Sequence, residues 1–137
     1  MKKFVSVILC LCLLTVLLSS CSGGISGDEA KSHINGFLAE IEKGDYQSAS
    51  DYLHAERPAN LELFFEGIEK DDGVDFQQTI TVKKYTGFSS SYYDSTVGGS
   101  TYSLDMVVTV GDDELTLSVE VVKNDNGFGI YNLDIDD

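Results

Sequence analysis

The sequence lacks tryptophan and has a single proline and three cysteines among its 137 residues. So few cysteines and prolines exclude a collagen-like chain and a domain stapled by several disulfides, and the overall composition argues against disorder. Basic residues are also scarce, because 9 Lys and Arg stand against 23 Asp and Glu, for a net charge of −14. A nucleic-acid partner is therefore not expected, since phosphate binding requires a basic surface. These totals favour one small, acidic globular domain.

The N-terminus has the features of a secretory signal. Met1-Lys2-Lys3 is positively charged, and Phe4–Leu18 is an apolar run interrupted only by Ser6 and Thr15. This run is shorter than the roughly 20 apolar residues that a spanning helix needs, which favours a signal peptide over residues 1–20. An ordinary secretory signal and an uncleaved N-terminal anchor are the alternatives.

The end of the run, Leu18-Ser19-Ser20-Cys21, resembles the lipobox of bacterial lipoproteins. The resemblance implies that Cys21 receives diacylglycerol and fatty acyl chains such as palmitate, and becomes the mature N-terminus. Cys10 and Cys12 would leave with the signal, so no internal disulfide is expected. Two acyl chains suffice for stable anchoring, because each buried methylene contributes about 0.8 kcal/mol. We expect a lipid-anchored protein on the extracytoplasmic face of the cell membrane.

The residues after the signal are rich in Gly and Ser. Residues 21–27 are expected to form the lipidated cysteine and a flexible tether with a reach on the order of 13 Å. Loss of Lys2 and Lys3 changes the net charge from −14 to −16. Anionic lipids repel such a body over a Debye length of about 8 Å. We therefore expect the folded part, residues 28–137, to stand off the bilayer, with its acidity serving spacing and solubility.

Three helices are expected in the first half of the chain. One begins at Asp28 and stops at Gly44, a shorter one runs from an Asp45 cap to about His54, and Asn60 caps the third. The apolar residues that carry the helical spacing are Ala30, Ile34, Phe37, Leu38, Ile41, Tyr46, Ala49, Leu53, Leu61, Phe64, Phe65 and Ile68.

The second half alternates apolar and polar residues, which is the period of strands. Strands are expected over Thr79–Val82, Tyr102–Val110, Leu115–Val121 and Phe128–Ile135, and Asn126-Gly127 suits a tight hairpin turn. Helices followed by a strand meander predict the α+β class, with the N-terminal helices packed on one face of an antiparallel sheet.

Ile34–Leu38 and Lys43–Ala49, followed by the meander and Asp125–Ile130, resemble small bacterial lipoproteins of the nuclear-transport-factor-two-like, cystatin-like superfamily. In that family the last strand often opens with Gly-Trp-Lys-Ile, whereas this chain has Phe128 and Gly129 in the middle two places. The resemblance implies a curved sheet wrapped round a helix, forming a cone with a pocket at its mouth. Some enzymes of the superfamily place an Asp or His there as a general base.

No catalytic residue, metal site or cofactor is expected from the sequence. The apolar sheet positions include no acid and no His, and Asp105 and Glu120 alternate onto the solvent-facing side. His33 lies at the boundary of the apolar stripe of the first helix, and His54 lies at a helix end, where the dipole favours a cation. The acidic residues in the expected turns are explained by the preference of Asp for turn positions, without a bound metal. An enzyme with His33 or His54 as its base is the alternative.

Residues 86–100 form the longest stretch without periodicity and are rich in Ser, Gly and Tyr, a composition that binding loops favour. We expect Phe88, Tyr92 and Tyr93 to contact a protein or small-ligand partner. The alternative is that the flanking strands extend into a long hairpin, with Gly98-Gly99 as a bulge or turn.

The function expected from these features is a membrane-anchored, extracytoplasmic binding module without catalysis. Besides the enzyme already named, a structural accessory subunit with no pocket is an alternative. Its core would be filled solidly by Phe37, Phe64 and Phe65.

Overall fold

The structure is a computed structural model that describes residues 24–136. The expected signal peptide and Cys21 lie outside the described residues. Within the described part, the elements in chain order are α2 (Gly27–Glu42), α3 (Tyr46–Ser50), α4 (Leu61–Asp72), β1 (Ile80–Asp94), β2 (Gly99–Val110), β3 (Asp113–Asn124) and β4 (Gly127–Asp136).

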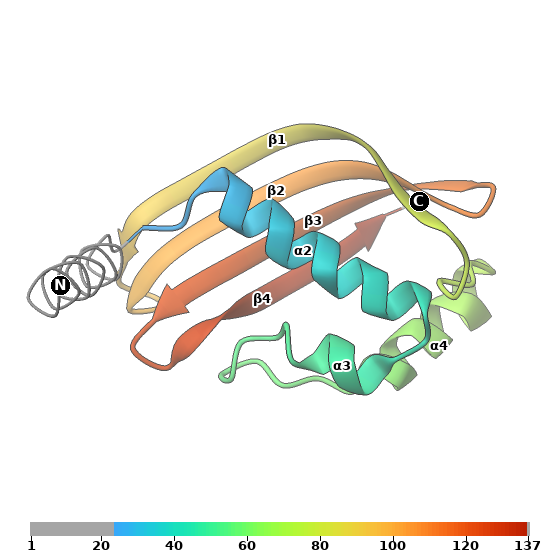
Figure 1. The fold of residues 1–137 in the computed structure, drawn as a ribbon, viewed down its shortest axis with the longest axis horizontal. Helices are drawn as coiled ribbons and strands as arrows, with labels where there is room; N and C mark the ends of the chain where they lie inside the picture. Colours follow the sequence, from blue (N-terminus) through green and yellow to red (C-terminus); the bar gives the residue numbers. More distant parts are fainter. Residues whose placement is uncertain (1–23, 137) are drawn as a thin grey trace, which may run out of the picture.

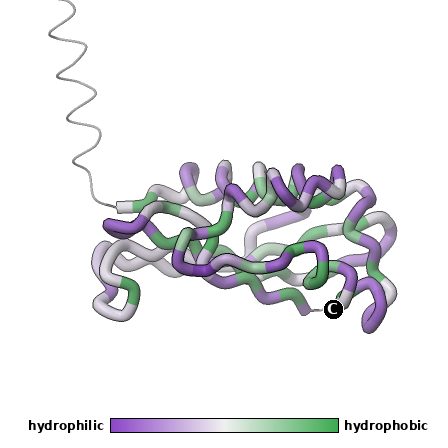
Figure 2. Tube along the Cα trace, turned by 90° about the horizontal axis from the view of Figure 1, so that it is seen from below, coloured by the Kyte–Doolittle hydropathy of each residue, from purple (hydrophilic) through white to green (hydrophobic). Residues whose placement is uncertain are grey.

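The four strands form one antiparallel meander in the order β1-β2-β3-β4, and α2 lies across one face of this sheet (Figure 1). Figure 2 shows the hydrophobic side of α2 turned toward the strands and its hydrophilic side turned away. The predicted α+β class, with helices first and a strand meander second, is confirmed. Among the described residues, no helix has the length and apolar content that crossing a membrane requires.

The first expected helix is present as α2. Its N-cap is Ser26, whose Oγ accepts a hydrogen bond from the Glu29 N–H at 3.1 Å. Gly44 follows its C-terminus with a φ of +72°, a conformation that glycine adopts at little cost. The helix therefore begins one residue before the expected Asp28 and stops where the sequence predicts.

The second helix is shorter than expected, because α3 ends at Ser50 rather than near His54. The chain leaves the helix to pair with the edge of β4. The Ile130 N–H donates to the Tyr52 carbonyl at 2.8 Å, and the His54 N–H donates to the Ile130 carbonyl at 2.9 Å. The prediction for the end of this helix is wrong, because pairing with a strand distant in the sequence replaces helical hydrogen bonds.

The third helix, α4, follows the sequence prediction at both ends. The Asn60 side chain accepts a hydrogen bond from the Leu63 N–H at 3.2 Å, and Gly73 closes the helix with a φ of +73°. Phe65 is buried, but Phe64 is 40 % exposed. The core therefore contains Phe37 and Phe65 without Phe64, which differs from the solid three-phenylalanine core that the accessory-subunit alternative requires.

The core lies between α2 and the sheet, with α4 covering one end. Its apolar side chains come from both halves of the chain, in the alternation that the sequence predicts for the strands. The buried members are Ala30, Ile34, Phe37, Leu38, Ile41, Ala49, Leu61, Phe65, Val74, Phe76, Leu104, Met106, Val108, Val110, Leu115, Leu117, Val119, Val121 and Ile130.

The segment 86–100 is mostly strand, so the expected binding loop is wrong as a description of its backbone. β1 continues to Asp94 and pairs with β2, with Phe88 opposite Leu104 and Ser90 opposite Tyr102. The long-hairpin alternative is confirmed. The sequence of this segment does not alternate between apolar and polar residues. The reason is that β1 is an edge strand with irregular register, and side chains on both of its faces are exposed in this segment.

Candidate functional site

Three large aromatic side chains project into solvent from the second half of β1. Phe88, Tyr92 and Tyr93 are 72 %, 75 % and 65 % exposed. Tyr92 and Tyr93 lie close to the turn of β1 into β2, whereas Phe88 lies farther back, opposite Leu104 near the middle of β2. We call these three residues the aromatic tip. The structure thus leaves all three residues that the sequence predicted as a contact surface exposed on the same edge strand.

A hollow beside Phe88 connects the aromatic tip to α2. The Phe88 ring stacks on the Tyr102 ring, with centroids 6.0 Å apart and planes 10° from parallel. Next to this pair, the Lys31 ammonium lies 4.4 Å from the centroid of the Tyr85 ring. These residues line a hollow of about 300 Å³, with Leu104 at its base. The surface there combines aromatic faces with one cation.

A second hollow of about 440 Å³ lies on the other side of the tip. It is lined by both tyrosines of the tip, by Lys123 and by the β3–β4 turn at Asp125. The Ser100 hydroxyl donates to the Tyr92 carbonyl at 2.7 Å and fixes the backbone at the end of β1. The tip is therefore exposed aromatic surface on a backbone held by hydrogen bonds.

The N-terminal side of the described chain runs directly past the tip (Figure 1). A Cβ added to Gly24 would lie 3.7 Å from Cδ2 of Tyr92, and one added to Gly27 would lie 2.8 Å from the Tyr102 hydroxyl. Ile25 packs against the hydrophobic core. Cys21 precedes Gly24 by three residues in the sequence and lies outside the described residues.

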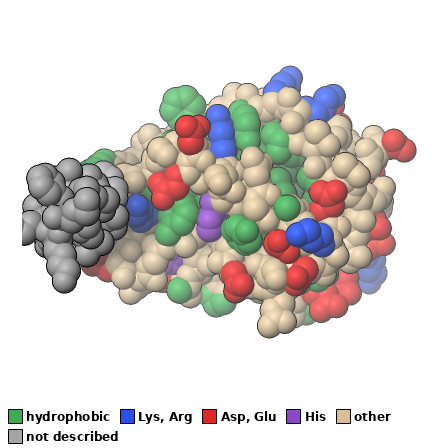
Figure 3. Space-filling view, in the orientation of Figure 1, with side chains coloured by type: hydrophobic (Ala, Val, Ile, Leu, Met, Phe, Trp, Pro, Cys, Tyr) green, Lys and Arg blue, Asp and Glu red, His purple; other side chains and the backbone are tan. Residues whose placement is uncertain are grey.

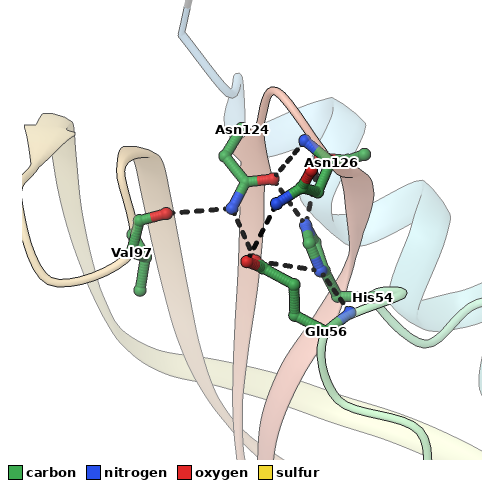
Figure 4. Close-up of polar contacts among 6 residues, drawn as sticks. His54, Glu56, Val97, Asn124 and Asn126 are labelled. Carbon is green, nitrogen blue, oxygen red and sulfur yellow. Dashed lines mark hydrogen bonds and ion pairs between the residues drawn. The ribbon is translucent and has the colours of Figure 1, made fainter.

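A polar cluster joins three loops beneath the tip (Figure 4). The Asn124 amide donates to a Glu56 carboxylate oxygen at 2.7 Å and to the Val97 carbonyl at 2.9 Å. The Asn126 amide donates to the other Glu56 oxygen at 3.1 Å. The β1–β2 turn, the β3–β4 turn and the segment after His54 are thereby tied together.

His54 is the buried centre of this cluster. Its Nδ1 accepts a hydrogen bond from the Glu56 N–H at 3.0 Å, so in the neutral ring the proton sits on Nε2. Nε2 then donates to the Asn124 Oδ1 at 3.0 Å and to the Gly127 carbonyl at 3.2 Å. His54 was expected at a helix end, as a cation facing the dipole. The expected helix end is wrong, because α3 ends at Ser50. The ring is 1 % exposed, with Nδ1 bound within its own segment and Nε2 bound by the β3–β4 turn.

His33 lies in a different environment on α2. Its Nε2 is 2.8 Å from the Tyr52 carbonyl, and its ring packs edge-on against Tyr52 and Phe128 at centroid distances of 5.0 Å and 4.6 Å. The expected position at the boundary of the apolar stripe is confirmed, since the residue is half-buried. The contacts place His33 against a carbonyl and two rings, with no carboxylate among them.

Hydrogen bonds set the charge state of two carboxylates near the tip. The amide groups of Asn124 and Asn126 lower the pKa of Glu56, because they donate to its ionised form. Thr96 lowers the pKa of Asp94 in the same way, through its hydroxyl at 2.6 Å and its backbone N–H at 2.8 Å. Both carboxylates are therefore held ionised and already have donors.

The acids of the sheet face away from the core. The Ser118 hydroxyl donates to Asp105 at 2.7 Å, and the Asn132 amide donates to Glu120 at 2.8 Å. Across residues 24–136, no three His, Cys, Asp or Glu side chains come close enough to hold a metal ion. These two sheet acids are paired with hydroxyl and amide groups on the surface.

One groove was not anticipated from the sequence. It has a volume of about 140 Å³ between α4 and β4, and Phe64, Tyr131 and Leu133 form its apolar walls. The Arg57 guanidinium lies 4.5 Å from the centroid of the Tyr131 ring at its rim. The sequence shows little sign of this groove. Phe64 has the same helical spacing as the buried residues of α4, so its position alone does not mark it as exposed.

Comparisons of the chain with protein-family models, with curated proteins and with solved structures find no match.

Proposed function

We propose that this protein is a membrane-anchored, extracytoplasmic lipoprotein that acts as a non-catalytic binding module. In this proposal residues 1–20 are removed as a signal peptide and Cys21 carries the lipid. The aromatic tip is the contact surface. The proposal unites the N-terminal sequence signals with the most exposed aromatic surface of the described chain.

The observation that carries the proposal is the exposure of three large aromatic rings along β1, two of them at the end of the sheet where Gly24 lies. Large aromatic side chains that stay in water forgo a favourable burial, and grouped apolar side chains on a surface are typical of interaction sites. Tyr combines a wide apolar ring with a hydroxyl at low rotamer cost, which suits contact with a surface that is partly polar.

The environments of the two histidines support a binding role rather than catalysis. Both ring nitrogens of His54 have partners, and the ring is 1 % exposed, so a substrate could reach it only by displacing the loops that it joins. The His33 Nε2 is occupied by the Tyr52 carbonyl. A general base needs a free nitrogen within reach of the substrate proton.

We further propose that the domain has the cone-like fold of the nuclear-transport-factor-two-like, cystatin-like superfamily. The support is architectural: a long first helix, two shorter helices and a four-stranded meander with the first helix across one face. A fold of this kind leaves function to be argued from the surface, as above.

The test is the chemical state of Cys21 in the full chain expressed in a bacterial host. Labelled palmitate should enter the wild type and the Cys12→Ser control, whereas Cys21→Ser should remain unlabelled. Intact mass should show loss of residues 1–20 and a diacylglyceryl group on the wild type. An unmodified thiol, or a retained signal, overturns the proposal.

A further inference from the structure

We infer that the aromatic tip docks onto the lipid surface itself, so that the domain stands on the membrane with the aromatic tip down. This inference rests on the proposed function, since it takes the lipid on Cys21 as given, and it names the partner of the tip as the interfacial layer of the bilayer.

The distance between the lipid and the tip is the first argument. Three peptide units separate Cys21 from Gly24, and a fully extended chain of that length spans at most about 11 Å. Gly24 lies beside the Tyr92 ring. Because the headgroup layer of one leaflet is itself roughly 5–8 Å thick, the tip is held at the membrane surface.

The chemistry of the tip is the second argument. Tyr rings are enriched where hydrocarbon meets water, because the ring lies among apolar groups while the hydroxyl stays hydrated. Phe serves on the apolar face of proteins that lie in this layer. The tip presents two exposed tyrosines and one exposed phenylalanine, Tyr92, Tyr93 and Phe88. This composition suits a layer that is apolar on one side and hydrated on the other.

The distribution of charge is the third argument. Between Thr86 and Leu104 the sole charged side chain is Asp94, and Thr96 already donates to it twice. Two cations, Lys31 and Lys123, line the hollows on either side of the tip. Asp125 also lines the second hollow, and Lys123 pairs with Glu29 at 3.8 Å. The segment of the tip therefore brings one carboxylate of its own toward anionic headgroups, with cations and acids both beside it.

The opposite end of the sheet carries dense negative charge. We call it the acidic end, and its acids are Asp71, Asp72, Asp112, Asp113, Glu114, Asp134 and Asp136. Lys70 and Lys83 lie at the same end, with Lys83 paired to Glu114, so acids outnumber cations there. Figure 3 shows acidic side chains gathered toward the right-hand end of the view, over the region of α4 and the C-terminus. A strand of 12 residues such as β2 is roughly 40 Å long, which is several Debye lengths. An orientation that brings the acidic end to the bilayer is therefore disfavoured by repulsion, whereas in the tip-down orientation that end lies beyond the range of the surface potential.

This charge distribution refines the expectation that the whole body stands off the membrane. The net charge keeps most of the domain away from the lipids, while the nearly uncharged tip lies nearest the anchor. A protein partner on the tip is the competing occupant, and it makes a different prediction for lipid contact.

The absence of tryptophan from the chain permits a direct test. In the full lipidated protein, Tyr92→Trp places a lone indole in the tip, and Phe64→Trp places one on α4 as the matched control. Both proteins are reconstituted into vesicles of phosphatidylcholine and phosphatidylglycerol, with either native or brominated acyl chains. We expect the bromolipids to quench the tip indole at least about twofold and to leave the control unchanged. Tyr93→Trp repeats the test at a second exposed site.

The outcomes separate the inference from the function on which it rests. Protein that floats with the vesicles but shows equal quenching at both sites overturns docking and leaves the lipoprotein proposal intact. A tip indole shielded from aqueous iodide but unquenched by bromolipid indicates a protein contact and also overturns it. Protein that fails to float, with an unmodified Cys21 by mass, overturns both.

Discussion

The two ends of the sheet are stabilised by different interactions. Beneath the aromatic tip, amide and imidazole groups form hydrogen bonds around His54, which is 1 % exposed. At the acidic end, Glu114 makes an ion pair with Lys83 at 2.9 Å, and both side chains are more than half exposed. Hydrogen bonds to a buried ring are costly to break, whereas exposed ion pairs add little and are screened by salt. The end of the sheet with the most exposed aromatic surface therefore also has the more firmly held backbone.

The largest effect is expected from Gly129→Ala, beneath the tip. A Cβ there would lie 2.5 Å from the His54 nitrogen and 2.6 Å from the Leu53 carbonyl carbon, both of them backbone atoms. The segment paired with β4 must move away, and we expect a loss of about 3 kcal/mol or more of unfolding free energy in urea titrations.

The matched control is Gly67→Ala in α4, where an added Cβ meets nothing within 4 Å. Alanine in a helix interior should stabilise by about 0.5–1 kcal/mol. Equal and small changes in the two variants would contradict the contrast between the ends.

The next largest effect is expected from His54→Leu. It leaves the Glu56 N–H and the Gly127 carbonyl without their buried partner, which should cost about 1–3 kcal/mol. His33→Leu removes one half-buried hydrogen bond and should cost less, about 0.5–1.5 kcal/mol. Urea midpoints measure both, and a His54→Leu protein as stable as the wild type would show that the cluster is dispensable.

The loss of stability at acid pH should depend on salt at the acidic end but not beneath the tip. Hydrogen bonds lower the pKa of Glu56 below the ordinary value of 4.5, and Lys83 lowers the pKa of Glu114 from the same value. Each carboxylate therefore stabilises the fold fully above pH 4.5, and this contribution is lost as the pH falls through the folded pKa. Glu56→Gln and Glu114→Gln should both flatten the acid limb of the stability curve in low salt.

High salt should then distinguish the two variants. At about 1 M salt the Debye length is about 3 Å, which screens the exposed Lys83–Glu114 pair but not the amide hydrogen bonds of Glu56. Thermal melts between pH 3 and 6 should show the Glu56→Gln effect in both salts and the Glu114→Gln effect in low salt only. A Glu56→Gln effect that disappears in high salt would contradict the contrast.

The smallest change in stability is expected from replacing the aromatic tip by serine at Phe88, Tyr92 and Tyr93 together. These side chains are at least 65 % exposed, so the unfolding free energy should change by about 1 kcal/mol or less. The main interaction that the replacement removes is the stacking of Phe88 on Tyr102. A destabilisation much above about 2 kcal/mol in thermal melts would mean that the tip serves the fold rather than binding.

The fold was predictable where structure depends on neighbours in the sequence. Apolar spacing located α2 and α4, the caps Asp45 and Asn60 make the expected hydrogen bonds, and Gly73 ends its helix. The β2–β3 and β3–β4 hairpins also followed from alternation and turn residues. Beyond Val82 the sequence left a loop and a long hairpin open, because an edge strand whose two faces are both exposed shows no alternation.

The candidate site was predictable in part. The aromatic residues of the tip were identified by composition alone, since Tyr and Phe among Ser and Gly are unusual on a surface. The cluster around His54 was missed, because its partners Asn124 and Gly127 are about 70 residues away in the sequence. No local pattern marks a hydrogen bond between segments so far apart.

The α+β class, the positions of most helix ends and the faces that β2 and β3 bury follow from the sequence, because they depend on periodicity and on capping within a few residues. Tertiary structure alone decided that Gly24 lies beside Tyr92, that His54 is buried, and that the aromatic and acidic ends lie at opposite ends of one sheet. Those relations depend on strand register and on long-range pairing, which fix distances between residues that are far apart along the chain.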